Sequence, residues 1–351
     1  MWTRNVIRHK RRKTLRHLCR LLIVIFLAAK KRNRLKQLFK YMSAPRDFFE
    51  AGFVRLSQPS ALNDPFEAAF CRKSLDELAS HFDSPTSWDP EFGELSFSQY
   101  VNLRINHIGV ISFTENKENL LMWAHYANEH KGIVAGVAYS PQIGCMFENL
   151  FRADALINSA WGEEWSQFDG IPKPVSYRKG LRYRNDKFDY DYSNISAEGA
   201  DRVLYEVFLQ KSDEWIYEQE HRVILRLEQA DRVIIQNLNS IANPSIKNRV
   251  KTAHYSTLNP NNDSCIINLF EITDNVVRAT VAMELAKLSQ NPKNIYLMRL
   301  SSSSINNCLI GLNSNITKAE VQGRYACSTG YLDIWKATKN MDYYSIEFEK
   351  I

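Results

Sequence analysis

Three short segments of the chain combine carboxylates, a guanidinium, a histidine and aromatic rings at spacings that suit a chemical site. The first reads Tyr-Glu-Gln-Glu-His-Arg at residues 217–222. Because side chains alternate across a strand, Glu218, Glu220 and Arg222 are expected on one face. Such a row can bind a sugar or provide acid/base catalysis. The alternative is a solvated face whose Glu–Arg pair adds little stability.

The second segment reads Leu-Leu-Met-Trp-Ala-His-Tyr-Ala at residues 120–127 and predicts a helix. At 100° per residue, Trp123 lies on the apolar face, His125 at its edge and Tyr126 on the far side. In a pocket wall, Trp123 would stack on a base and His125 would transfer a proton or donate a hydrogen bond. The alternative is a core tryptophan beside a boundary histidine.

The third segment is Asn-Asp-Pro-Phe-Glu at residues 63–67, which predicts a turn. Asp64 precedes a proline, so it is held out of the helical region and can close a turn with its own carboxylate. A turn without a chemical role is one interpretation. The other is a rigid loop that aims Asp64 and Glu67 into a site, where they would bind a ribose diol, a base or a cation.

We expect the three segments to converge on one enzyme-like pocket, since polar and aromatic residues are concentrated in them. The expected catalytic residues are Glu220, Glu218 and His125, and the expected substrate-binding residues are Tyr41, Asn63, Asp64, Glu67, Trp123, Tyr126 and Arg222. The sequence has no dinucleotide-binding glycine fingerprint, no phosphate-binding Gly-Lys loop and no zinc-ligand spacing. No metal ligand is therefore assigned.

The elements that must position these residues alternate between strands and helices without a long run of either. This pattern predicts an α+β fold, a single mixed domain over residues 38–351 with a central, mainly antiparallel sheet flanked by helices. Residues 236–265 are rich in Asn and Ser and predict a flexible insertion.

The net charge of +6 is unevenly distributed. Residues 1–37 carry 13 Lys and Arg and no acid, which leaves 32 basic and 39 acidic side chains, a net charge of −7, in residues 38–351. The basic pI is therefore no evidence for nucleic-acid binding by the folded part. The apolar run in the leader has nine residues, whereas a spanning helix needs roughly 20. A misassigned start codon and a basic helix resting on a membrane surface are the favoured interpretations. Six scattered cysteines predict a cytoplasmic location.

The motifs at residues 39–43, 60–67, 120–127 and 215–222, in this order, resemble the bacterial family named domain of unknown function 2971. The resemblance covers about residues 38–351 and excludes the leader, which supports the misassigned start. It implies no established activity.

The layout is also similar, more weakly, to ADP-ribosyltransferase-like proteins. The resemblance would make Lys40 or Tyr41 a polar anchor, Ser112 part of a Ser-bearing strand and Glu218–Glu220 a Glu-x-Glu motif. It implies NAD as a substrate and a protein or nucleic acid as the modified target. A bacterial toxin or phage-defence effector is the expected biological setting, although no residue motif indicates it. Glu220 would stabilise the oxocarbenium-like sugar formed as nicotinamide leaves.

Two other classes of function stay open at this stage. Asp64, Glu67, His125 and Glu220 are the residue types of a metal-dependent nuclease. A binding or sensor module without chemistry would instead use the Trp-rich loop, with Trp161 and Trp165, as its interface.

Overall fold

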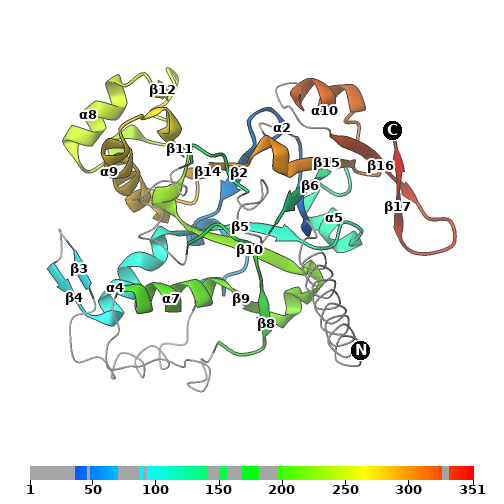
Figure 1. The fold of residues 1–351 in the computed structure, drawn as a ribbon, viewed down its shortest axis with the longest axis horizontal. Helices are drawn as coiled ribbons and strands as arrows, with labels where there is room; N and C mark the ends of the chain where they lie inside the picture. Colours follow the sequence, from blue (N-terminus) through cyan, green and yellow to red (C-terminus); the bar gives the residue numbers. More distant parts are fainter. Residues whose placement is uncertain are drawn as a thin grey trace, which may run out of the picture.

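Two sheets built mainly from antiparallel strands share one hydrophobic core in the computed structural model of the chain (Figure 1). The structure describes residues 36–45, 48–69, 87–89, 93–140, 150–155, 168–181, 197–325 and 332–351. The predicted α+β class is confirmed. Most of the leader and both Trp161 and Trp165 lie outside the described residues.

The larger sheet has eight strands in the order β17-β16-β15-β6-β1-β5-β10-β7. Only the β15–β16 pair is parallel. The strands are β1 Lys36–Met42, β5 Ile108–Thr114, β6 Ile133–Tyr139, β7 Lys173–Pro174, β10 Glu220–Arg226, β15 Ile305–Ile310, β16 Asp333–Lys339 and β17 Ile346–Lys350. Strands β5, β6 and β10 are buried on both faces. The near-continuous apolar sequences of β5 and β6 agree with this burial, whereas β10 buries Glu220 and Arg222 as an ion pair.

The smaller sheet has five antiparallel strands in the order β12-β13-β11-β14-β2. They are β2 Phe53–Leu56, β11 Arg232–Ile235, β12 Ser256–Leu258, β13 Cys265–Asn268 and β14 Ile295–Arg299. Two short ribbons complete the strands, an antiparallel pair of β3 Ser87–Asp89 with β4 Gly93–Leu95 and a parallel pair of β8 Ser176–Arg178 with β9 Gln210–Ser212.

The described helices are α2 Phe48–Ala51, α4 Phe97–Arg104, α5 Leu120–Tyr126, α7 Ala197–Phe208, α8 Pro244–Thr252, α9 Asn275–Ala286 and α10 Lys318–Tyr325. Side-chain caps define several of their starts. Ser96 and Gln99 form a reciprocal capping box at α4, and Asn119 accepts from two backbone N–H groups at the start of α5. None of the described helices has the length and apolar character required to cross a membrane.

The two faces of the larger sheet pack against different apolar clusters. Leu38 of β1 belongs to the main core between the sheets, whereas Tyr41 and Phe39 belong to a smaller cluster on the opposite face. Strand alternation explains this division. Helix α5 covers part of the smaller cluster with Trp123, and Tyr126 and Tyr217 pack against the same cluster.

Residues 236–265, where a flexible insertion is expected, contain helix α8 and strand β12. The side chain of Asn243 caps α8, and Ile246 and Val250 on one face of this helix are buried. Strand β12 then pairs with β13. The Asn and Ser residues that suggested flexibility therefore serve partly as helix caps and turn residues, which is a common use of these side chains.

Candidate active site

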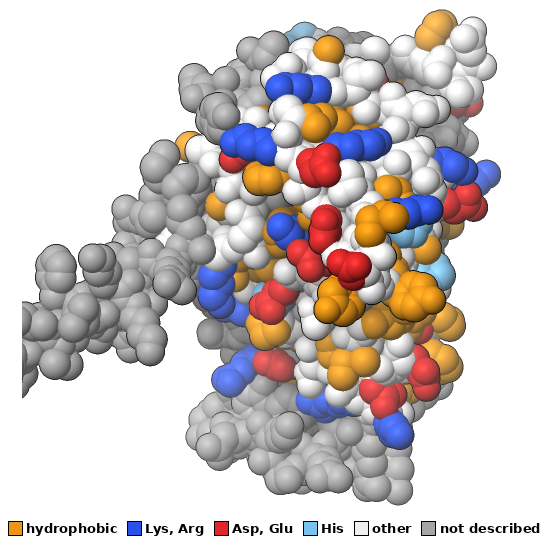
Figure 2. Space-filling view, turned by 90° about the vertical axis from the view of Figure 1, so that its right-hand side faces the viewer, with side chains coloured by type: hydrophobic (Ala, Val, Ile, Leu, Met, Phe, Trp, Pro, Cys, Tyr) orange, Lys and Arg blue, Asp and Glu red, His pale blue; other side chains and the backbone are white. Residues whose placement is uncertain are grey.

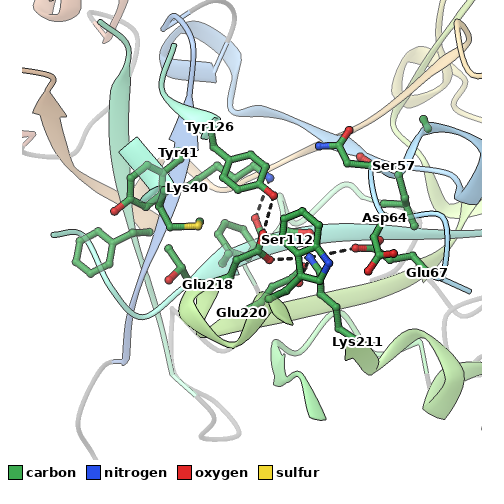
Figure 3. Close-up of a pocket in the computed structure, with 18 residues that line it drawn as sticks. Lys40, Tyr41, Ser57, Asp64, Glu67, Ser112, Tyr126, Lys211, Glu218 and Glu220 are labelled. Atoms are coloured by element: carbon green, nitrogen blue, oxygen red, sulfur yellow. Dashed lines mark hydrogen bonds and ion pairs between the residues drawn. The ribbon is translucent and has the colours of Figure 1, made fainter. Parts of the chain in front are cut away.

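A pocket with a cavity volume of about 160 Å³ opens beside strands β1, β5 and β10 (Figure 3). Seven predicted site residues line it: Tyr41, Asn63, Asp64, Glu67, Tyr126, Glu218 and Glu220. They come from the loop after β2, from α5, from β1 and from the segment that leads into β10. The predicted convergence of the three segments is thus present in the structure.

Lys211 of β9 lies at the centre of the carboxylates, and the sequence interpretation did not assign it to the site. Its Nζ atom is 3.1 Å from Glu67 Oε1, 2.6 Å from Glu218 Oε2 and 3.2 Å from Glu220 Oε2. The same atom lies 4.9 Å from the ring centroid of Trp215. Burial disfavours the ammonium charge, but Glu220, Glu67 and Glu218 raise the pKa of Lys211 above its ordinary value.

Glu220 and Arg222 form a buried pair on β10. Arg222 donates from Nε to Glu220 Oε1 at 2.8 Å and from Nη2 to Glu220 Oε2 at 2.9 Å, and Nη2 also donates to Glu67 Oε1 at 2.9 Å. Burial alone would raise the pKa of Glu220, but the charges of Arg222 and Lys211 lower it to about 2. Arg222 is 1% exposed and supports the pocket from behind. It therefore acts as a positioning residue.

Glu218 reaches the pocket from a backbone different from the predicted strand. It ends the 3-10 helix Asp213–Glu218, and Gln219 follows with a left-handed φ of 46° before β10 begins. Tyr126 donates its hydroxyl to Glu218 Oε1 at 2.6 Å. Burial raises the pKa of Glu218 above its ordinary value, although Lys211 and Tyr126 act in the opposite direction. A buried carboxyl with a raised pKa suits proton transfer near neutral pH.

Asp64 forms the predicted turn, since its Oδ1 atom accepts from the backbone N–H of Phe66 at 2.9 Å. Its other oxygen, Oδ2, is buried and has no hydrogen-bond partner among the described residues. The residue is 6% exposed and lines the pocket. A buried acceptor without a partner carries a desolvation cost, which a ligand hydroxyl or amine would remove.

Lys40 of β1 is a second cation of the pocket. Its Nζ atom donates to the carbonyl oxygen of Ser112 at 2.8 Å, and both residues line the cavity. Burial lowers the pKa of Lys40 to about 8, while Glu220 acts in the opposite direction. The sequence interpretation had named Lys40 and Ser112 only through the weaker resemblance.

Trp123 and His125 do not line the pocket, so the structure places them apart from the other predicted site residues, and their predicted roles stay predictions. Trp123 is fully buried, lies edge-on to Tyr41 at 5.4 Å between ring centroids, and donates from Nε1 to the carbonyl oxygen of Lys117 at 2.8 Å. His125 is exposed beside Tyr126. The helix turns Tyr126, rather than His125, toward the carboxylates.

The fold and the pocket define an α+β protein with a charged, aromatic-walled cavity at its larger sheet. Residues 122–223 match the model of the family described as Protein of unknown function (DUF2971). This stretch includes Tyr126, Lys211, Glu218 and Glu220, and the match confirms the resemblance predicted from the motifs. No curated protein and no solved structure matches the chain. The resemblance to ADP-ribosyltransferase-like proteins gains no support from these comparisons and stays a prediction.

Proposed function

We propose that the chain is an enzyme that cleaves a glycosidic bond of a ribosyl substrate, with NAD as the first substrate to test. One observation carries the proposal. The Glu218 carboxyl, with its raised pKa and its bonds from Tyr126 and Lys211, lies in the same pocket as the unpartnered oxygen of Asp64. An acid/base group and a free acceptor for a hydroxyl are the two requirements of such a site.

The size of the cavity limits what enters it. A cavity of about 150 Å³ holds a molecule as small as benzene, and the pocket measures about 160 Å³. One ring, a ribose or a nicotinamide, therefore fits at a time, and the rest of a dinucleotide must extend outside. Asp64 Oδ2 would accept a hydrogen bond from a ribose hydroxyl, and Trp215 and Tyr126 offer aromatic walls.

In the proposed reaction Glu218 takes the catalytic role that the sequence had led us to expect for Glu220. Arg222 and Lys211 lower the pKa of Glu220 to about 2, so its carboxylate is too weak a base to take a proton and instead holds Lys211 in place. The C1′–N bond breaks and its electron pair leaves with nicotinamide. A water or acceptor hydroxyl then bonds to C1′ and gives its proton to the Glu218 carboxylate, whose charge also stabilises the cationic sugar.

The test incubates the purified chain with NAD labelled in the adenylate portion, with and without bacterial lysate as an acceptor source. Nicotinamide release or label transfer is expected for the native chain and should fall about 10²- to 10⁴-fold in Glu218→Gln, which keeps the shape but cannot accept the proton. Glu320→Gln on α10 is the matched control, because its carboxylate lies in an exposed pair with Arg324. Binding of NAD without turnover would instead indicate a sensor module.

The geometry favours this proposal over a metal-dependent nuclease. Three carboxylates, those of Glu67, Glu218 and Glu220, converge on the ammonium of Lys211, which takes the position where a divalent cation would be bound. Among the residues that the structure describes, no group of three His, Cys, Asp or Glu side chains could hold a metal ion. His125, a ligand in that hypothesis, is on the exposed side of α5.

We also propose a cytoplasmic site of action, in agreement with the free and buried thiols of Cys265 and Cys308 in the described part of the chain. A toxin or phage-defence effector is the proposed biological setting. Expression of the native chain in bacterial cells should then deplete the dinucleotide and slow growth, and Glu218→Gln should relieve both effects.

A further inference from the structure

A second and larger hollow lies on the same face of the larger sheet as α5. Its cavity volume is about 700 Å³, and its floor and walls come from β1, β15, β16, β17 and the loop before α5. Three aromatic residues, Phe39, Trp335 and Phe348, line it together with the amides of Gln37, Asn307 and Asn340. We refer to this hollow as the aromatic groove.

The aromatic residues of the groove are half-buried on the sheet surface rather than packed inside it. Trp335 of β16 and Phe348 of β17 lie on neighbouring antiparallel strands, and Phe39 approaches from β1. Flat rings exposed on a sheet are suited to stacking on a nucleobase.

Three hydrogen bonds fix the loop before α5, whose Lys117 and Glu118 line the groove. Tyr41 donates its hydroxyl to the carbonyl oxygen of Asn116 at 2.9 Å, and Trp123 Nε1 donates to that of Lys117 at 2.8 Å. Asn119 Nδ2 donates to the carbonyl oxygen of Tyr217 at 2.7 Å. The loop is therefore preorganised, which lowers the entropy cost of binding. It places Lys117 Nζ 5.2 Å from the ring centroid of Phe348.

Phe39 lines both the aromatic groove and the active-site pocket. The two hollows thus meet at one side chain. A ligand that stacks a base in the groove can direct its sugar-phosphate part across Phe39 toward Asp64 and Glu218. The pocket alone is too small for more than one ring, so the adjoining groove provides the missing space.

The charge of the groove favours a free nucleotide over a nucleic-acid strand. Lys117 is its one lining cation among the described residues, against the two carboxylates of Glu118 and Glu347. A strand is bound by a row of cations that neutralise successive phosphates. On the face that Figure 2 shows, described Lys and Arg side chains are dispersed among acidic and hydrophobic ones rather than gathered in a row.

We propose that the aromatic groove binds the nucleobase of a free nucleotide, stacked between Trp335 and Phe348. Nucleotide binding in the groove does not depend on the proposed reaction. Binding of the second base of a dinucleotide there does rest on the proposed function.

The first experiment titrates the full chain with adenosine monophosphate and follows binding by calorimetry. Trp335→Leu should weaken binding by roughly 5- to 150-fold, the range expected for loss of one base–aromatic stack. Phe348→Leu is a second variant, and equal unfolding midpoints identify variants that remain folded. Tyr344→Leu is the matched control, because Tyr344 is fully exposed and does not line the groove.

The second experiment compares KM for NAD with KM for nicotinamide mononucleotide, which lacks the second base. Trp335→Leu should raise KM for NAD alone. Cleavage of NAD with an unchanged KM in this variant overturns the inference and leaves the proposed function intact. Binding of adenosine monophosphate that depends on Trp335, without NAD cleavage, supports the groove and removes the proposed function. Absence of nucleotide binding, or binding of single-stranded RNA in its place, overturns the inference.

Discussion

The hydroxyl of Tyr126 lies 2.6 Å from Oε1 of Glu218, although 92 positions separate the two residues in the sequence. This hydrogen bond joins the end of α5 to the turn before β10, and so connects two of the three segments predicted to carry chemistry. Lys211 holds the other oxygen of the same carboxyl at 2.6 Å. The ionisation of Glu218 is therefore controlled by two side chains, one bonded to each of its oxygens.

Removal of the Tyr126 hydroxyl should shift the pH dependence of the reaction. The hydrogen bond favours ionised Glu218, so Tyr126→Phe raises the pKa of Glu218 further. A hydrogen bond to a charged group is stronger than a neutral one by about 1 kcal/mol, and this difference corresponds to roughly 0.7 pH unit. If Glu218 acts as a base, the acidic limb of the kcat/KM profile for NAD moves to higher pH by about this amount. A shift to lower pH would contradict the role of Tyr126.

Loss of Arg222 should strongly destabilise the fold. Arg222→Met leaves Glu220 and Glu67 buried with Lys211 as their remaining cation, and removal of one member of a buried ion pair costs about 3–5 kcal/mol. Urea unfolding measures the change. Arg324→Met serves as the control, because its exposed pairs with Glu50 and Glu320 should contribute about 1 kcal/mol or less. Equal losses in both variants would mean that the buried network is not coupled to stability.

Lys40 should make the free energy of unfolding depend on alkaline pH. Burial lowers its pKa from 10.5 to about 8, so between these values the unfolded chain binds more protons than the folded one. Stability therefore rises with pH across this window. Lys40→Met should be more stable than the native chain at pH 7, by up to roughly 3 kcal/mol. The difference should shrink from pH 8 to pH 10.5, and a constant difference would contradict this assignment.

Asp64 should lower the stability of the ligand-free protein and strengthen the binding of NAD. Asp64→Asn keeps the oxygen that accepts from the Phe66 N–H but removes an unpartnered buried carboxylate charge. Without ligand, the variant should unfold at a higher urea concentration, with a gain of about 1 kcal/mol. Its KM for NAD should rise about tenfold, because the ribose hydroxyl loses a charged acceptor. A less stable variant with unchanged KM would assign Asp64 to the turn alone.

Substitutions of His125 and Trp123 should not act on the pocket directly, because neither residue lines it. His125→Ala should leave NAD cleavage unchanged and alter stability by about 0.5 kcal/mol or less, as is usual for exposed positions. Trp123→Phe should lower stability by about 1–3 kcal/mol, since the carbonyl of Lys117 loses its donor. Thermal unfolding and initial rates distinguish the two. Loss of activity in His125→Ala would restore its predicted catalytic role.

Local patterns in the sequence predicted the parts of the site that depend on neighbouring residues. The turn at Asp64 follows from the proline that comes next, and β5 and β6 follow from continuous apolar runs. The convergence of Asp64, Tyr126 and Glu220 could be expected from their chemistry. Which face of α5 meets the pocket could not, because Trp123 fills the cluster beneath the helix and this contact depends on β16 and β17 more than 200 residues away.

Lys211 shows the other limit of sequence reasoning. Its position is set by the parallel β8–β9 pair, which brings Ser212 beside Arg178 and turns the lysine toward acids from two other segments. Nothing adjacent to it in the sequence marks it as a site residue, apart from the nearby Trp215. The helix within residues 236–265 was not predicted for a related reason, since Ile246 and Val250 are buried only in the folded chain.

The left-handed residue Gln219 has a consequence for how the reactivity of this protein can be altered. It is exposed and lines neither the active-site pocket nor the aromatic groove, yet its φ of 46° changes the backbone direction between Glu218 and Glu220. A β-branched residue resists this conformation at a cost of about 1–2 kcal/mol. Substitution to valine would rotate the Glu218 carboxyl away from Tyr126 while Glu220 and Arg222 kept their places in the sheet. The backbone conformation of the exposed Gln219 thereby sets the position of the Glu218 carboxyl in the pocket.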